Sequence, residues 1–189
     1  KCDKTVKTLA NECSDPTTVE NETMKRREMI FSEEQLPGLF FRRLSWTPDG
    51  SCLITPACQY NVEGQDDIHD SGHRFCVYIF NREDLSVPVK KLPGLKRPAL
   101  AIRCCPILFS PHRNNEIPYR MIFAVATADS ILIYDTENDL PLAISMYSHF
   151  APITDICWFP NAMGLIASSR DGYISRFSFE VGELGNPLK

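Results

Sequence analysis

The stretch LFFRRLSWTPDGSCLITPA, residues 39–57, predicts a β-hairpin. Leu44 and Trp46 alternate with a polar residue, which is the two-residue period of a strand. The Pro-Asp-Gly sequence at 48–50 supplies the chemistry of a turn, because proline fixes φ, aspartate accepts hydrogen bonds and glycine tolerates a positive φ. Apolar residues then resume as the return strand. Whether this hairpin belongs to a larger fold depends on whether the pattern recurs.

The pattern recurs nearer the C-terminus. In residues 153–179, Trp158 precedes a turn and an apolar return strand, and a second turn at Asp171 leads into a third strand. A shorter copy in residues 121–136 has its turn at Asp129. Asp129 and Asp171 are 42 residues apart, which is the length of one four-stranded WD40 blade. Blades of this kind close into a β-propeller.

Apolar or β-branched runs, separated mostly by proline and glycine, predict an all-β domain. The runs cover residues 52–55, 75–80, 99–109, 121–127, 131–134, 142–147, 153–159, 165–168 and 173–179. Stacked blades bury both faces of their inner strands, which explains why MIFAVA and ILIY are apolar throughout. We therefore expect part of a WD40 β-propeller, with about three blades and a strand of a fourth.

The repeat divides the chain into five segments. They are residues 1–9, the end of a preceding blade; 10–38, a polar insertion or loop; 39–98 and 99–140, two WD40 blades; and 141–189, a blade with a C-terminal extension. Shorter insertions at 59–74 and 110–118 would lengthen the first two blades.

Aspartates at the blade turns are expected to be structural. A short acceptor side chain can satisfy backbone N–H groups at a hairpin tip, and we assign this role to Asp3, Asp49, Asp129 and Asp171. His149 stands 22 residues before Asp171, so we expect it to hydrogen-bond toward this aspartate and hold a loop against the hairpin. The alternative is an exposed loop histidine.

Composition argues against several classes of protein. With 189 residues, 43% of them apolar and 23% charged, the chain has the composition of an ordinary globular domain. A net charge of −4 argues against a protein that coats nucleic acid, and no apolar run approaches the roughly 20 residues of a membrane helix. The opening KCDKTVKTL lacks an initiator methionine, so we interpret the chain as a piece of a longer protein.

The cysteines favour a reducing compartment, either the nucleus or the cytosol. Five of the eight lie inside apolar, strand-like runs, where a free cysteine behaves as a small hydrophobic residue: Cys52, Cys76, Cys104, Cys105 and Cys157. Such settings do not suggest a disulfide framework.

Signals for catalysis or metal binding are weak. The sequence contains no G-x-S-x-G, phosphate-binding loop, G-x-G-x-x-G or H-E-x-x-H motif. His69 and His73 have a metal-ligand spacing and lie between Cys58 and Cys76, but neighbouring glycines break any helix and no paired C-x-x-C supports zinc. We therefore expect a polar hairpin loop there, no catalytic residue, no metal and no cofactor.

Basic side chains are the candidates for partner binding. An acidic segment or a phosphate backbone could contact Arg42, Arg43, Lys90, Lys91, Lys96 and Arg97. The alternatives are a solvated loop between blades for residues 90–97 and, for the two arginines, a cover over a blade edge. Acidic positions could instead meet a basic partner such as a histone; they are Glu33, Glu34, Asp66, Asp67, Asp70, Glu137 and Asp139.

Four longer motifs carry a family resemblance. FFRRLSWTPDGSCLITPA, RPALAIRCCPILF, PYRMIFAVATADSILIYDT and DGYISRFSFEVGELGNPLK resemble the WD40-propeller middle subunits of chromatin assembly factor 1, over residues 1–9 and 36–189. The closing motif is shared with the related HIRA family. The resemblance implies a seven-bladed propeller, of which this chain holds the last three blades and a strand of the one before.

The resemblance also implies a nuclear, non-enzymatic scaffold for nucleosome assembly on replicating DNA. Its partners would be histones H3–H4, the large and small subunits of the complex, and an ASF-type histone chaperone bound through a segment after the propeller. Contact with DNA would be indirect, and no membrane is implied. The alternatives are a HIRA-like subunit that works outside replication and a generic WD40 adaptor such as a ubiquitin-ligase substrate receptor. An enzyme would need a cluster of acid, base or metal ligands, which the sequence does not offer.

Overall fold

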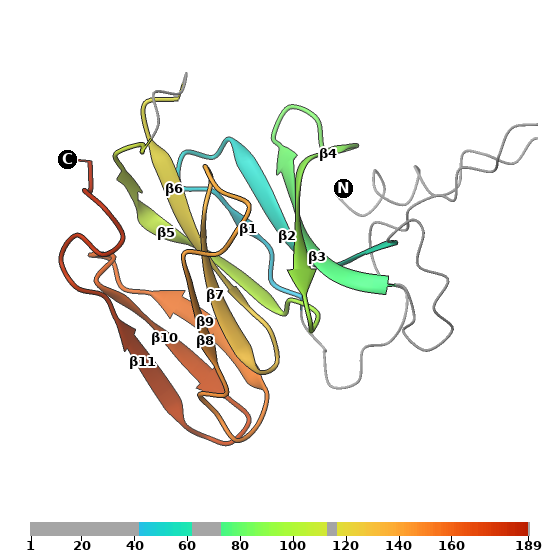
Figure 1. The fold of residues 1–189 in the computed structure, drawn as a ribbon, viewed down its shortest axis with the longest axis vertical. Coiled ribbons are helices and arrows are strands. Elements are labelled where there is room, and N and C mark those ends of the chain that lie inside the picture. Colours follow the sequence, from blue (N-terminus) through green and yellow to red (C-terminus); the bar gives the residue numbers. More distant parts are fainter. Residues whose placement is uncertain (1–41, 62–72, 113–116, 189) are drawn as a thin grey trace, which may run out of the picture.

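The computed structural model describes residues 42–61, 73–112 and 117–188, and this part of the chain is all-β (Figure 1). Its strands are β1 (Ser45–Trp46), β2 (Cys52–Asn61), β3 (His73–Asn81), β4 (Pro88–Leu95), β5 (Ala101–Phe109), β6 (Arg120–Ala126), β7 (Ser130–Asp135), β8 (Ala143–Met146), β9 (Ile153–Trp158), β10 (Gly164–Ser169) and β11 (Ile174–Ser178). Among these residues, no helix is long and apolar enough to cross a bilayer.

The strands form three antiparallel sheets in which sequential strands are neighbours. The first sheet has the order β1-β2-β3-β4, the second β5-β6-β7-β8, and the third β11-β10-β9. Figure 1 shows the second sheet between the other two. The first strands of the sheets, β1, β5 and β9, lie beside one another. Such stacked meanders around a common inner edge are the architecture of propeller blades, which confirms the fold class predicted from the sequence.

The opening hairpin forms where the sequence predicts it. β1 pairs with β2, so that Ser45 lies opposite Ile54 and Trp46 opposite Leu53. Gly50 has a φ of 73°, in the left-handed region that favours glycine at a turn. The Pro-Asp-Gly turn therefore fixes the register that places Ile54 in the core between the first two sheets.

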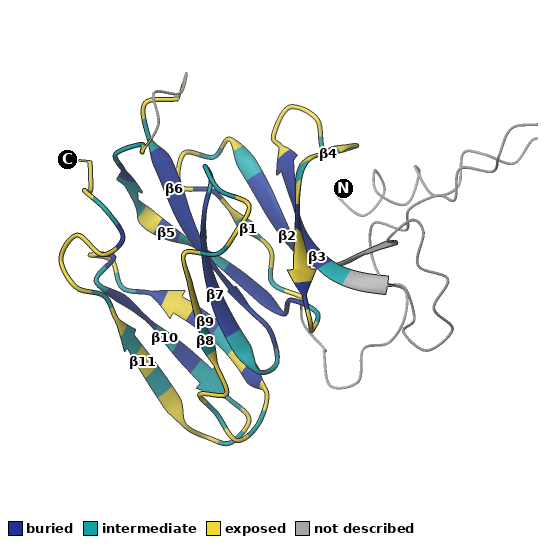
Figure 2. Ribbon diagram, in the orientation of Figure 1, coloured by how far each residue is buried: buried dark blue, intermediate teal, exposed yellow. Residues whose placement is uncertain are grey.

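The residues of β6 alternate between two hydrophobic cores. Phe123 and Val125 pack against the first sheet, whereas Ile122 and Ala124 pack against the third. All residues of β6 are buried, as the dark blue of this strand in Figure 2 shows. A strand covered on both faces loses the polar–apolar alternation of a half-buried strand, which explains the continuous apolar run in the sequence.

The basic segment that includes Lys90 and Lys91 is not a loop between blades. It forms β4, the outer strand of the first sheet, and Lys90 and Lys91 lie opposite Ile79 and Tyr78 of β3. Prolines and lysines are tolerated on an outer strand because one of its edges needs no hydrogen-bond partner. The loop interpretation was therefore wrong for Lys90 and Lys91, whereas Lys96 and Arg97 do lie in the connection between β4 and β5.

The sheets also differ from the expected segment border at residue 140. β8 lies beyond that border, yet it pairs with β7 and completes the second sheet. The second sheet runs from Ala101 to Met146 and the third from Ile153 to Ser178. The apolar run at 142–147 therefore closes one blade instead of opening the next. Segments 1–9 and 10–38, with Asp3, lie outside the described residues.

Candidate interaction surface

Asp49 organises the turn between β1 and β2. Its Oδ1 accepts hydrogen bonds from Thr47 Oγ1 at 2.6 Å and from the backbone N–H of Ser51 at 3.0 Å. Its Oδ2 accepts one from the Tyr119 hydroxyl at 2.9 Å, just before the first residue of β6. The carboxylate therefore ties the first sheet to the second as well as capping its own hairpin.

Asp129 lies in the turn between β6 and β7, the second and third strands of the second sheet. Its Oδ1 accepts hydrogen bonds from Thr127 Oγ1 at 3.0 Å and from Ser130 Oγ at 2.7 Å. Arg97 Nε lies 3.5 Å from Oδ2, so Asp129 also contacts the connection that follows β4. Thus Arg97, a candidate for partner binding in the sequence, contacts a turn of the neighbouring blade.

Asp171 holds the loop before β9 against the turn between β10 and β11. Its Oδ2 lies 3.2 Å from His149 Nδ1 and accepts the backbone N–H of Phe150 at 3.0 Å. Its Oδ1 accepts the N–H of Tyr173 at 2.9 Å. Both members of the His149–Asp171 pair are almost fully buried, so the pair expected from the sequence is an internal clamp and His149 is not an exposed loop side chain.

The three described turn aspartates have lowered pKa values. Burial raises the pKa of Asp49, Asp129 and Asp171, but several hydrogen bonds to each carboxylate lower it by more, so each pKa falls below the ordinary 3.8. A carboxyl group with a depressed pKa in the folded state stabilises the fold above its unfolded pKa, and that contribution disappears as the pH falls through the folded pKa.

We expect the thermal midpoint to change little between about pH 7 and pH 5 and to fall below about pH 4, where these carboxylates take up protons. Changing Asp129→Asn together with Asp171→Asn should lower the midpoint at neutral pH and make the acid-induced fall shallower. Circular dichroism melts over this pH range measure both effects. If the thermal midpoint of the double variant falls with decreasing pH as steeply as that of the unchanged protein, these carboxylates do not carry the pH dependence.

Three charged side chains meet where the inner strands adjoin. On β9, Asp155 accepts hydrogen bonds from Arg103 Nη2 at 3.1 and 3.2 Å, and Arg43 Nε lies 3.3 Å from its Oδ2. Roughly a third of each side chain stays exposed, so each pair contributes at most about 1 kcal/mol. The geometry nevertheless links all three sheets through one carboxylate. Sequence reasoning missed Asp155, because its partners lie far away along the chain.

The candidate basic residues do not converge on one patch. Lys90 Nζ lies 2.9 Å from Asp139 Oδ1, beyond the end of β7, whereas Arg97 contacts Asp129 just before the start of β7. Lys91 and Lys96 are exposed at β4 and after it, and Arg42 is exposed before β1. Arg43 and Arg97 both take part in ion pairs between sheets. Their first role is therefore structural.

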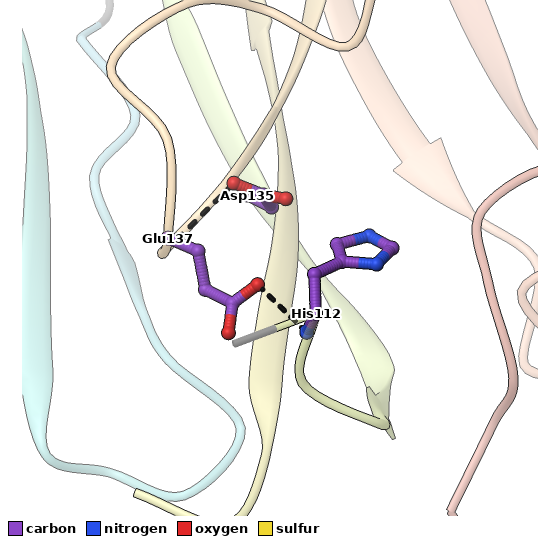
Figure 3. A group of neighbouring side chains, drawn as sticks. All are labelled: His112, Asp135 and Glu137. Atoms are coloured by element: carbon purple, nitrogen blue, oxygen red, sulfur yellow. Dashed lines mark hydrogen bonds between the residues drawn. The ribbon is translucent and has the colours of Figure 1, made fainter. Parts of the chain in front are cut away.

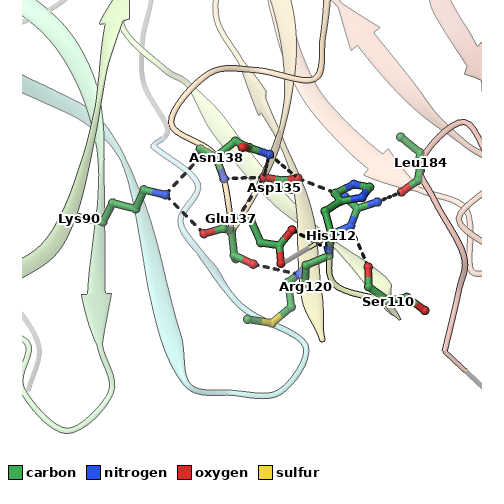
Figure 4. Close-up of polar contacts among 10 residues, drawn as sticks. Lys90, Ser110, His112, Arg120, Asp135, Glu137, Asn138 and Leu184 are labelled. Atoms are coloured by element: carbon green, nitrogen blue, oxygen red, sulfur yellow. Dashed lines mark hydrogen bonds and ion pairs between the residues drawn. The ribbon is translucent and has the colours of Figure 1, made fainter. Parts of the chain in front are cut away.

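A buried ion pair anchors the C-terminal segment to the second sheet (Figure 4). Arg120 and Asp135 are both almost completely buried, and Arg120 Nη1 lies 3.2 Å from Asp135 Oδ2. Arg120 also donates to the backbone carbonyls of Ser110 and Leu184. A side chain at Gly185 would collide with the guanidinium, and the glycine itself has a φ of 100°. The network therefore depends on a glycine at this position.

His112, Asp135 and Glu137 are, among the described residues, the group with the spacing of a metal site (Figure 3). Their potential ligand atoms lie within 4.8 Å of one another. The Asp135 carboxylate, however, already accepts the N–H groups of Glu137 and Asn138 and pairs with Arg120. Glu137 accepts the backbone N–H of His112 at 3.0 Å. A cation would have to displace a buried guanidinium, so we assign this group to the fold.

The structure shows free thiols at five positions: Cys52, Cys76, Cys104, Cys105 and Cys157. Burial raises the pKa of Cys104 and of Cys105 to about 11, so both stay protonated at neutral pH. Of the earlier metal candidates, His73 is the first residue of β3, whereas His69 lies outside the described residues.

The stacked meanders, with polar contacts that hold turns and sheets together, define a protein of the β-propeller class. Residues 2–184 match a family model described as "CAF1B/HIR1 beta-propeller domain". The chain therefore belongs to the CAF1B/HIR1 β-propeller family.

Named relatives agree with this family. The chain is 42% identical over 168 residues to the chromatin assembly factor 1 subunit FAS2 homolog of Oryza sativa subsp. japonica, an alignment that covers 85% of this chain and 31% of the relative. It is 41% identical over 166 residues to the B-type subunit of chromatin assembly factor 1 from Mus musculus, covering 79% and 27%. Protein HIR1 of Candida albicans is 31% identical over 154 residues, covering 79% and 16%. The chain spans about a third or less of these relatives.

Proposed function

We propose that this chain is the propeller portion of a B-type subunit of chromatin assembly factor 1, which helps to deposit histones H3–H4 on newly replicated DNA. The observation that carries the proposal is the 33–42% identity, over most of the chain, to proteins named as chromatin assembly factor 1 subunits in yeast, mouse and rice. A nuclear, chromatin-associated location follows from the same names. The chain would act there as a non-enzymatic scaffold.

The chain's own residues would supply rigidity. The turn clamps of Asp49, Asp129 and Asp171, and the buried Arg120–Asp135 pair, fix loops that would otherwise move. Loops held on a rigid frame bind with a smaller loss of conformational entropy. The proposed partners are histones H3–H4, the large and small subunits and an ASF-type chaperone, with DNA contacted only indirectly.

A HIRA-like subunit that works outside replication is the second candidate, because HIR1 and HIR2 proteins also align with most of this chain at 26–31% identity. The higher identity to the chromatin assembly factor 1 subunits favours the first candidate. The two differ in the complex that would accompany the protein.

Affinity purification of the full-length protein from dividing cells tests the proposal. We expect histones H3 and H4 and the large chromatin assembly factor 1 subunit to copurify with it. Recovery of HIR-type subunits would favour the second candidate, and ubiquitin-ligase components without histones would contradict both. Lys96→Glu should lower partner recovery several-fold if the basic residues bind a partner, whereas Arg176→Glu, at another exposed position on β11, serves as the matched control.

A further inference from the structure

The outer strand of the second sheet, β8, carries an exposed apolar row. β8 pairs with β7 on one side and is the last strand of its sheet in the described part of the chain. The exposed fractions of Leu142, Ile144 and Met146 are 43%, 55% and 46%. These residues alternate along β8 and the position just before it, so they project from one face. Figure 2 colours this strand largely as exposed.

The β8 edge lacks the features that normally protect an edge strand. Lysine, proline and inward charges discourage further strand pairing. β4, the outer strand of the first sheet, has Pro88, Lys90, Lys91 and Pro93. In contrast, residues 142–147, LAISMY, contain no charge and no proline. Except for its shortness, this edge is open to another strand.

The charge around β8 points to the chemistry of an occupant. Two acidic residues, Glu137 and Asp139, lie in the turn before β8, and residues 140–169 contain no lysine or arginine. Asp139 stands shortly before β8, and its side chain is 74% exposed although it contacts Lys90. Glu137 lies in the same turn and is half-buried. A basic group on an occupant would therefore be attracted to this end of the strand.

We propose that β8 binds an extended segment of a partner protein by strand addition. The segment has apolar side chains at alternate positions, which cover Leu142, Ile144 and Met146, and a lysine or arginine that reaches Asp139. Strand addition supplies main-chain hydrogen bonds, and the exposed row supplies specificity. The row extends over one short strand, which suits a peptide-sized segment better than the roughly 800 Å² per partner of a stable globular interface.

The test uses the full-length protein and labelled eight-residue peptides with valine and threonine alternating and a lysine at each end. The control peptide has glutamate at each end. We expect the lysine peptide to bind at least about tenfold more tightly in fluorescence anisotropy and to slow amide exchange in residues 142–147. Ile144→Lys should weaken binding about tenfold, whereas Val89→Lys, at a comparably exposed position on β4, should change it less than twofold.

Equal binding of the two peptides, or no binding, would overturn the proposal. So would an Ile144→Lys protein that binds like the unchanged protein, or a Val89→Lys protein that loses affinity equally. Concentration-dependent dimers that Ile144→Lys abolishes would identify a second copy of the chain as the occupant of β8. That result would also overturn the proposal that a segment of a partner protein binds there. None of these results depends on the chromatin assembly proposal.

Discussion

Replacement of Arg120 by methionine is expected to lower the free energy of unfolding by about 3–5 kcal/mol, because it leaves the buried Asp135 carboxylate without its cation. The same change removes the hydrogen bonds to the carbonyls of Ser110 and Leu184. Urea denaturation of the full-length protein, followed by far-ultraviolet circular dichroism, measures the loss.

The double variant Arg120→Met with Asp135→Asn separates the charge effect from the loss of packing. Asparagine keeps an acceptor for the N–H groups of Glu137 and Asn138 but carries no charge. The double variant should therefore be more stable than Arg120→Met alone, which is a positive coupling in a double-mutant cycle. A loss below about 1 kcal/mol for Arg120→Met would mean that the pair is not buried as described.

Replacement of Trp158 by alanine is expected to cost about 3–5 kcal/mol. Trp158 is 7% exposed in the core between the second and third sheets and stacks on Phe179 at a ring-centroid distance of 5.7 Å. Its Nε1 also donates to the carbonyl of Arg103 at 2.9 Å. The change would create a cavity and would leave a carbonyl without its donor.

Trp46 provides the matched control because it has the same place in the repeat. Trp46 is 39% exposed among the described residues, and the guanidinium of Arg82 lies over its ring at 4.7 Å. Trp46→Ala should therefore cost less than half as much as Trp158→Ala in the same urea titrations. Similar losses for the two variants would indicate that burial between blades does not decide the stability of this repeat.

The sequence predicted most of the architecture from local signals and from the spacing of one repeat. A turn of proline, aspartate and glycine, followed by apolar runs, was sufficient to locate β1 and β2, and the continuous run at 121–127 indicated a strand buried on both faces. The 42-residue spacing of Asp129 and Asp171 related matching turns of the second and third sheets, between β6 and β7 and between β10 and β11. These signals are reliable because turn chemistry and burial act on neighbouring residues.

The outer strands were harder to predict. β4 has the prolines, lysines and glycine of a loop, and only its position at the edge of a sheet makes that composition compatible with a strand. β8 was recognised as an apolar run but was assigned to the following blade. Outer strands are paired on one side and partly exposed, so burial constrains their sequence less than it constrains β6.

The polar networks could not be predicted from spacing. Arg103 and Asp155 are 52 residues apart, and Arg120 reaches a carbonyl 64 residues away. Charged residues inside apolar runs give no periodic signal, and their partners become visible only when the sheets stack. The His149–Asp171 pair was the exception, because a repeat of known length related the two positions.

The inner ends of the two seams between the sheets are held by contacts that differ in how much amino-acid substitution they can tolerate. At the first seam, the N–H of Arg43 donates to the carbonyl of Leu100, and the N–H of Ile102 donates to the carbonyl of Arg43. At the second, the Trp158 and Arg103 side chains donate to carbonyls across the gap. The N–H of Ile153 also donates to the carbonyl of Ala128 across the second seam. Main-chain groups survive almost any exchange of residue, so the hydrogen bonds of the Arg103 and Trp158 side chains are the contacts most sensitive to substitution.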